Sequence, residues 1–173
     1  MIAGVALRID RLWDGAIARP SEAATVTVRR DGDGAVHVHV DAPDHGDPAP
    51  DSPPGSTDRL WEHEVVELFL LGDDAHYTEL ELGPGGHYLV LRLEGRRNPV
   101  EAGLPLEASF WREGGRWGAR ATLPAALVPA GELRGNAYAI HGHGAERRYL
   151  AWTPVPGDGP DFHRLEHFGL LGL

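Results

Sequence analysis

Short runs of alternating apolar and polar residues, each ended by a glycine- or proline-rich turn, restrict this chain to a β-rich fold. Residues 24–30 (ATVTVRR) and 35–42 (AVHVHVDA) alternate with a period of two and are separated by a DGDG turn. The 23 Gly and 14 Pro residues favour many short strands over long helices. The alternation predicts a hairpin whose shared face carries Val26, Val28, Val36, Val38 and Val40.

The same pattern continues along the chain and predicts an all-β protein. Further strands are expected at 65–70, 76–82, 87–93, 106–113, 116–123, 136–144 and 147–155, with a short last strand near the C-terminus. About nine strands and little helix predict one antiparallel β-sandwich domain over residues 1–173, of jelly-roll or immunoglobulin-like type. We expect a long proline-rich loop at 43–58, another loop at 94–103, and at most a short helical turn within 124–133.

Composition excludes several classes of site and partner. The chain has no cysteine and no lysine, and Met1 is its one methionine. Thiolate metal sites and Schiff-base lysines are therefore excluded, and the single methionine argues against an axial-methionine haem. A net charge of −10 argues against nucleic acid or an anionic membrane as a partner. Early charges and the lack of a long apolar run predict a soluble, cytoplasmic protein.

The stretch LWEHEVVELFL (60–70) places a carboxylate, Glu67, inside an apolar run. Strand pairing across the loop at 72–75 decides where Glu67 points. If it faces Glu81, it shares a polar sheet face with Glu79 and Glu81, whereas if it faces Leu80 it points into the core. The sequence leaves both registers open. In the first register an arginine, a metal ion or a proton must separate the acids, because close like charges repel.

The turn GPGG (83–86) sets the register of the next strand, and Arg96 and Arg97 follow that strand at the rim of the sheet. Adjacent strand residues point to opposite sides. We therefore expect one of the two arginines to turn back to Glu67 or Glu64. If Leu82 faces His87, the polar face carries Tyr77, Glu79, Glu81 and Arg92, and the core face carries Leu80, Leu89 and Leu91.

Histidine pairs are further candidates for a metal or acid–base site. His37 and His39 share a strand face, as do His141 and His143, and His163 precedes His167 by four residues. Alternation in a half-exposed strand accounts for the first two pairs without a metal, so structural roles are favoured there. The arginines at 147 and 148 are expected to pair with carboxylates in so acidic a chain. No serine lies in a G-x-S-x-G motif.

Five segments carry a resemblance to a known family: LWEHEVVELFL, YTELELGPGGHYLVLRLEGRRN, AIHG, RRYLAWTPVP and PDFHRLEHF. In this order they resemble an uncharacterised protein family of animals and bacteria, and WDG (13–15) also fits it. More distantly, the pattern is similar to DOMON-like β-sandwiches and to the ninth family of carbohydrate-binding modules, which bind haem or sugars. That resemblance implies a sugar-stacking pair, Trp61 and Trp152, beside one polar concavity. The segment PDFH (160–163) belongs to the family pattern, which makes Asp161 and His163 candidates to line a site, and the alternative role for Asp161 is to cap a turn.

The predicted function is non-catalytic binding of a carbohydrate or another small polar ligand in a concavity on a sheet face. The alternatives are an enzyme that uses a Glu/His/Arg cluster for metal-assisted or acid–base hydrolysis, and a structural or protein-interaction domain. No cofactor is expected, and a bound metal ion is left open. The candidate ligand-binding residues are Trp61, His63, Glu64, Glu67, Tyr77, Glu79, Glu81, Arg92, Arg97, His141, Trp152, Asp161 and His163.

Overall fold

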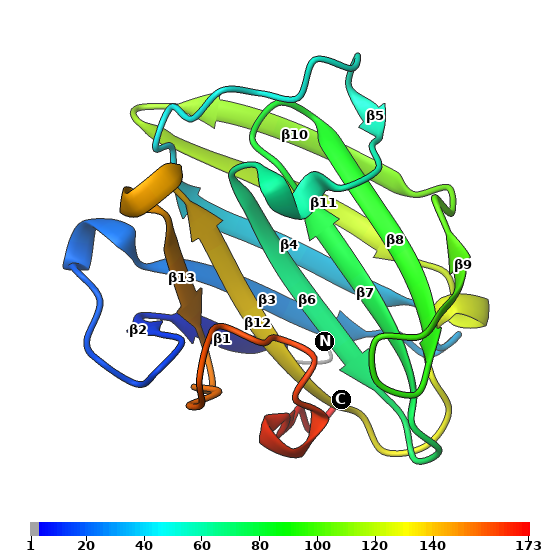
Figure 1. Cartoon of the computed structure of the whole chain (residues 1–173). Helices are drawn as coiled ribbons and strands as arrows, with labels where there is room; N and C mark the ends of the chain where they lie inside the picture. The colour runs from blue at the N-terminus through cyan, green and yellow to red at the C-terminus, as the bar shows by residue number, and fades with distance from the viewer. Residues whose placement is uncertain (1–3) are drawn as a thin grey trace.

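The computed structural model describes residues 4–173, in which two β-sheets pack face to face (Figure 1). The strands are β1 (Val5–Ile9), β2 (Arg11–Leu12), β3 (Ala24–Arg30), β4 (Val36–Pro43), β5 (Gly55–Ser56), β6 (Val65–Leu71), β7 (His76–Leu82), β8 (His87–Glu94), β9 (Pro99–Ala102), β10 (Glu107–Glu113), β11 (Arg116–Leu123), β12 (Arg134–His141), β13 (Arg148–Ala151) and β14 (Gly169–Leu170). The short 3₁₀ helices are η1 (Pro20–Glu22), η2 (Leu60–Glu62), η3 (Ala125–Leu127), η4 (Gly144–Glu146) and η5 (Leu165–His167).

The sheet orders confirm the predicted antiparallel β-sandwich. One sheet runs β1-β3-β4-β11-β10, and the other runs β2-β13-β12-β6-β7-β8-β5, with β9 on β8 and β14 on β12. Within the described residues, the pair of β5 and β8 is parallel and the other pairs are antiparallel. None of the helices seen in residues 4–173 has the length and apolar character to cross a membrane. The first three residues of the predicted domain lie outside the described part.

The core between the two sheets is built on the predicted valine hairpin. Strands β3 and β4 pair with Val26 facing Val40 and Val28 facing Val38, and these side chains are buried with Val36. Inward-pointing residues of β6 and β7, including Leu68 and Leu80, belong to the same cluster. The alternation in the sequence therefore predicted this face correctly.

Strands β6 and β7 are buried on both faces. Every residue of β6 is buried, as is every residue of β7 except His76. The outer face carries a second apolar cluster that includes Phe69 and Tyr138 and is covered by Phe162 and Phe168. Figure 1 shows this covering segment in orange and red, in front of the sheet. Burial on both faces explains the near-continuous apolar run in β6, which is typical of a central strand.

The two hairpins that flank β7 differ in how well the sequence predicted them. Glu67 faces Glu81, so the polar-face register of β6 is the one that forms. The register across GPGG was wrong by one residue, because Leu82 faces Tyr88. Gly83 donates to the His87 carbonyl (2.9 Å) and Gly86 has φ +86°, which closes a three-residue loop with a left-handed glycine.

Two connections are more regular than expected. The loop predicted at 94–103 contains strand β9, which pairs with the edge of β8. All four β9 side chains are exposed, so no alternation signals it in the sequence. Within 43–58, β4 extends to Pro43 and β5 adds two paired residues, while the remainder has no helix or strand. Helix η3 confirms the short helical turn expected within 124–133.

Candidate ligand-binding site

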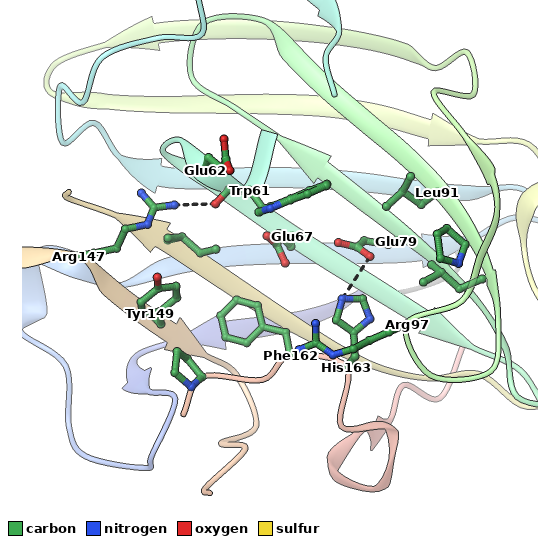
Figure 2. A pocket seen from close by; sticks show the side chains of 14 residues that line it. Trp61, Glu62, Glu67, Glu79, Leu91, Arg97, Arg147, Tyr149, Phe162 and His163 are labelled. Atoms are coloured by element: carbon green, nitrogen blue, oxygen red, sulfur yellow. Dashed lines mark hydrogen bonds and ion pairs between the residues drawn. The ribbon is translucent and has the colours of Figure 1, made fainter. Parts of the chain in front are cut away.

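A cavity of about 690 Å³ opens on the outer face of the larger sheet (Figure 2). This volume is within the range of small-molecule sites. Strands β6, β7, β8 and β12 form its floor. Its walls are η2, the β8–β9 connection with the start of β9, and β13 with the chain on either side of it. The lining residues are Trp61, Glu62, Glu67, Glu79, Leu91, Leu93, Arg97, Pro99, Ile140, Arg147, Tyr149, Pro160, Phe162 and His163.

Two buried carboxyl groups, Glu67 and Glu79, lie at the floor of the cavity. They share one sheet face because Glu67 faces Glu81, which is two residues beyond Glu79 on β7. Burial, and then the charge of Glu79, raises the pKa of Glu67 well above its usual value. Burial raises the pKa of Glu79 to about 7. The floor therefore holds carboxyl groups that can be protonated near neutral pH.

Tyr77 fixes the ring of His163 beside Glu79. The Arg97 amide donates to the Tyr77 hydroxyl oxygen (3.0 Å), and that hydroxyl lies 2.8 Å from His163 Nδ1. Burial, and then the charge of Arg97, lowers the pKa of His163 to about 4, so the ring is neutral at pH 7. With the hydroxyl donating to Nδ1, the ring proton lies on Nε2, 3.8 Å from Glu79 Oε2. His163 thus offers an N–H donor at the cavity wall.

Arg96 and Arg97 both pair with Asp161, and neither pairs with Glu64 or Glu67. Arg97 Nη2 lies 2.5 Å from Asp161 Oδ1, and Arg96 binds the other carboxylate oxygen. The expectation that only one arginine could turn back is wrong, because Arg97 has φ +57° in a turn rather than strand geometry. These ion pairs join the β8–β9 connection to the C-terminal wall, where Asp161 also accepts the His163 amide (3.0 Å).

We expect Arg97→Ala to lower the free energy of unfolding by less than about 1 kcal/mol, and Arg96→Ala to do the same. Both side chains are more than half exposed (57% and 51%), so water screens their ion pairs. Urea unfolding of each variant against the wild type measures the loss. A loss above about 2 kcal/mol for Arg97→Ala alone would show that this pair is not solvent-screened.

Arg147 holds the tryptophan wall of the cavity through main-chain carbonyls. Its guanidinium donates to the carbonyls of Trp61 (2.6 Å), His63 (3.2 Å) and Gly142 (2.8 Å). No carboxylate within residues 4–173 forms an ion pair with it, so the expected carboxylate pairing is wrong for this arginine. The neighbouring Arg148 fulfils that expectation, through a buried acid outside the cavity.

Curated relatives identify the family. The chain is 40% identical to the human UPF0462 protein C4orf33 over 171 residues, which cover 93% of this chain and 84% of that protein. The zebrafish homologue is 40% identical over 170 residues (92% and 85%), and the mouse homologue 40% over 171 residues (93% and 88%). The chain belongs to the UPF0462 family. No family model matches it.

Solved structures with a similar fold are described as carbohydrate-binding proteins. A putative carbohydrate-binding protein from Bacteroides uniformis matches the UPF0462 chain with a TM-score of 0.75 at 16% identity, covering 96% of this chain and 84% of that one. A family 9 carbohydrate-binding module from Caldicellulosiruptor kristjanssonii in complex with cellotriose matches with a TM-score of 0.58 at 14% identity (97% and 80%). At these identities the similarity establishes the β-sandwich fold of the UPF0462 chain.

Two predicted site residues of the UPF0462 chain lie on the other side of the larger sheet. Ala151 belongs to the outer cluster. Because successive residues of an extended chain point to opposite faces, the next residue, Trp152, packs against the core between the sheets. It lines a separate depression with Pro154, so the expectation that Trp61 and Trp152 share one concavity is wrong. Arg92 points away from Glu79 because of the one-residue register shift, and pairs with Glu101 (2.6 Å).

Three more predicted residues anchor the proline-rich loop beside the cavity. Buried Glu64 accepts hydrogen bonds from two loop amides (3.0 and 3.2 Å). His63 Nδ1 lies 3.4 Å from the Pro48 carbonyl, and His141 stacks on His45 with ring centroids 3.6 Å apart. None of the three lines the cavity. In the UPF0462 chain these side chains position the loop that leads into η2.

The main residues missed by sequence reasoning are Tyr149 and Phe162, which form an aromatic wall opposite Trp61 (Figure 2). Phe162 stacks on buried Tyr138 with ring centroids 3.8 Å apart. Both missed aromatics stand in the segments RRYLAWTPVP and PDFHRLEHF, next to polar residues that were considered. Of the predicted residues, the structure of the UPF0462 chain brings Trp61, Glu67, Glu79, Arg97 and His163 together around the cavity.

Proposed function

We propose that this UPF0462 chain is a non-catalytic binding domain whose cavity takes a carbohydrate or another small polar ligand. The observation that carries the proposal is the combination of aromatic walls with an acidic floor. Trp61 stands on one side of the cavity and Phe162 on the other, with Glu67 and Glu79 between them (Figure 2). The C–H face of a sugar ring packs on aromatic side chains, while its hydroxyl groups require hydrogen-bond partners.

The polar groups of the cavity suit a ligand that carries several hydroxyl groups. Glu67 and Glu79 supply acceptors, and the neutral ring of His163 supplies an N–H donor. Arg97 adds a guanidinium at the rim. Because a hydroxyl group both donates and accepts, a polyol can satisfy both kinds of partner. Structures of similar fold in complex with cellotriose and with glucose support a sugar as the first ligand class to test.

The proposal predicts that Trp61→Ala weakens ligand binding at least about tenfold, a loss of about 1.4 kcal/mol. Trp61 is 40% exposed at the cavity, so its ring is available to a ligand. Isothermal titration calorimetry with a panel that includes glucose and cellotriose measures the affinity. Urea unfolding of the variant checks that it stays folded under the titration conditions, because the Trp61 ring is also partly buried.

Trp111→Ala is a matched control for this experiment. Trp111 is 39% exposed and lies on β10, in the other sheet, where it stacks on His39. This variant should bind the same sugars as tightly as the wild type. Equal affinity of the Trp61→Ala variant, or no binding of any sugar by the wild type at millimolar concentration, would contradict the proposal.

Acid–base hydrolysis is the second candidate function, and Glu79 is the observation that favours it. Its raised pKa, about 7, is suited to proton transfer at neutral pH, and it shares the cavity with a second carboxyl group, Glu67. Incubation of oligosaccharides with the protein, followed by measurement of new reducing ends, separates the two functions. The binding proposal expects no release above that of a Glu67→Gln/Glu79→Gln variant, and release that depends on both acids would favour hydrolysis.

A further inference from the structure

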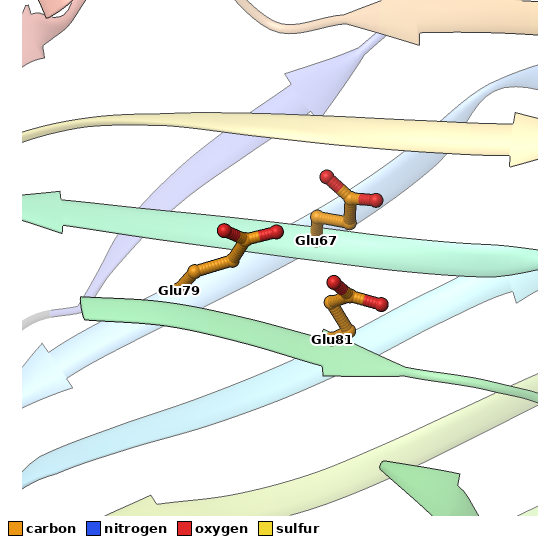
Figure 3. Close-up of side chains that lie close together, drawn as sticks. All are labelled: Glu67, Glu79 and Glu81. Atoms are coloured by element: carbon orange, nitrogen blue, oxygen red, sulfur yellow. The ribbon is translucent and has the colours of Figure 1, made fainter. Parts of the chain in front are cut away.

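Three carboxylates from two neighbouring strands converge beneath the cavity. Glu67 on β6 faces Glu81 on β7, and Glu79 lies two residues before Glu81 on the same face. One oxygen from each carboxylate lies within 4.8 Å of the other two. Figure 3 shows the three side chains directed toward one shared space. Such a cluster must be either protonated or neutralised by a positive charge.

All three carboxylates are buried, and two of them have oxygens without a hydrogen-bond partner. Glu67, Glu79 and Glu81 are 2%, 3% and 0% exposed. Both oxygens of Glu81 and Oε2 of Glu79 have no hydrogen-bond partner in residues 4–173. The two arginines at the cavity are held elsewhere, Arg97 by Asp161 and Arg147 by carbonyl groups. Unpartnered buried polar groups are rare in folded proteins and point to a missing ligand.

The geometry and chemistry of the cluster match a hard divalent cation. All three donors are carboxylate oxygens, which suit calcium and magnesium rather than softer metals. Calcium takes six to eight oxygen ligands at about 2.3–2.6 Å, so oxygens on opposite sides of the ion are about 5 Å apart. Magnesium at about 2.0–2.1 Å would require them to approach to about 4 Å. The three oxygens lie within 4.8 Å of one another, which fits inside the span of a calcium coordination sphere.

The cavity supplies a route and further ligands for the ion. Glu67 and Glu79 line the cavity, so an ion can reach them from solvent, while Glu81 lies beside them under the floor. Three carboxylates leave coordination positions free on the cavity side, where water completes the shell. We propose that Glu67, Glu79 and Glu81 bind one Ca²⁺ ion at the floor of the cavity. This site goes beyond the proposed function, because ion binding does not require a sugar ligand.

The test is thermal unfolding of the wild type and of Glu81→Gln, each with a chelator and with Ca²⁺ in millimolar excess. Ca²⁺ at about 100 times its dissociation constant should raise the wild-type melting temperature by roughly 5–10 °C. Glu81→Gln should show no Ca²⁺ response. In chelator this variant should melt at or above the wild-type temperature, because the substitution removes an unpartnered buried carboxyl group. Calorimetric titration should give one Ca²⁺ per wild-type chain.

Glu113→Gln is the charge-matched control, since Glu113 is an exposed residue on β10 in the other sheet. It should keep the full Ca²⁺ response, which separates a specific site from general attraction of cations to an acidic chain. No Ca²⁺ response in the wild type would overturn the proposal and leave shared protons as the neutralising charge. An equal response in Glu81→Gln would also overturn it. A Mg²⁺ response equal to that of Ca²⁺ would overturn the assignment to calcium.

Discussion

Glu22→Ala is expected to lower the free energy of unfolding by about 3 kcal/mol at pH 7, the low end of the range for a broken buried ion pair. The Glu22 carboxylate is buried and accepts two hydrogen bonds from Arg148 (2.7 and 2.8 Å). It also lies 2.9 Å from His141 Nε2 and accepts the Arg19 amide (2.9 Å). Removing it leaves Arg148 without its partner, although part of that side chain still reaches water.

The difference in unfolding free energy between the wild type and Glu22→Ala should disappear in acid. The hydrogen bonds from Arg148, with other contacts, lower the pKa of Glu22 from 4.5 to about 2. A lowered acid pKa contributes stability that is fully present above pH 4.5 and is lost as the pH falls to about 2. Each pKa unit corresponds to about 1.4 kcal/mol, so the contribution is about 3 kcal/mol. Urea midpoints of wild type and Glu22→Ala, measured from pH 7 to pH 2, should therefore converge.

Glu101→Ala provides the comparison for an exposed pair. Glu101 binds Arg92 on the surface (2.6 Å), and its loss should change stability by less than about 1 kcal/mol. If Glu22→Ala and the wild type differ as much at pH 2 as at pH 7, the ion pair is not the source of the stabilisation.

Asn136→Ala is expected to destabilise the protein by about 3–4 kcal/mol, because it leaves several buried polar groups unsatisfied. The side chain is fully buried and donates to the Tyr138 hydroxyl (2.9 Å) and the Thr153 carbonyl (2.8 Å). Its oxygen accepts the amides of Ala137 (2.9 Å) and Thr153 (3.0 Å). The Tyr138 hydroxyl in turn donates to the Phe162 carbonyl (2.9 Å), so this network also supports the aromatic wall of the cavity.

Equilibrium urea unfolding measures the loss, and Asn98→Ala is its control. The exposed Asn98 side chain donates to the Glu94 carbonyl (3.0 Å), so its removal should cost less than about 0.5 kcal/mol. A loss below about 1 kcal/mol for Asn136→Ala would mean that water replaces the asparagine in its bonds.

The fold could be predicted where burial on one face leaves an alternating pattern. The valines of β3 and β4 alternate with polar residues, and their face was assigned correctly. The register after GPGG could not be assigned, because it depends on which residue closes the loop. Pairing of Gly83 with His87 moved Arg92 to the opposite face from the one expected. A one-residue slip reverses every side chain of a strand.

The site could be predicted only in part, because several of its contacts join segments that lie far apart in the sequence. Glu67 was found because it breaks an apolar run, and Trp61 was found from the resemblance of its segment to sugar-binding modules. The pairing of Arg97 with Asp161 joins residues 64 positions apart, and no local spacing encodes it. Phe162 reads as an ordinary apolar residue, and its place in the cavity wall follows from how the C-terminal segment crosses the sheet.

Because β6 and β7 are buried on both faces, amide exchange should be slow at the floor of the cavity and fast in the connections around it. Amide protons of such central strands exchange with solvent at rates close to those of global unfolding, whereas loop amides exchange through local opening. We therefore expect the carboxyl groups of the floor to keep their positions more closely than the connections around Arg97 and Phe162. Under the proposed binding function, changes in the lengths and side chains of these connections would alter ligand preference with no change to the β6–β7 hairpin.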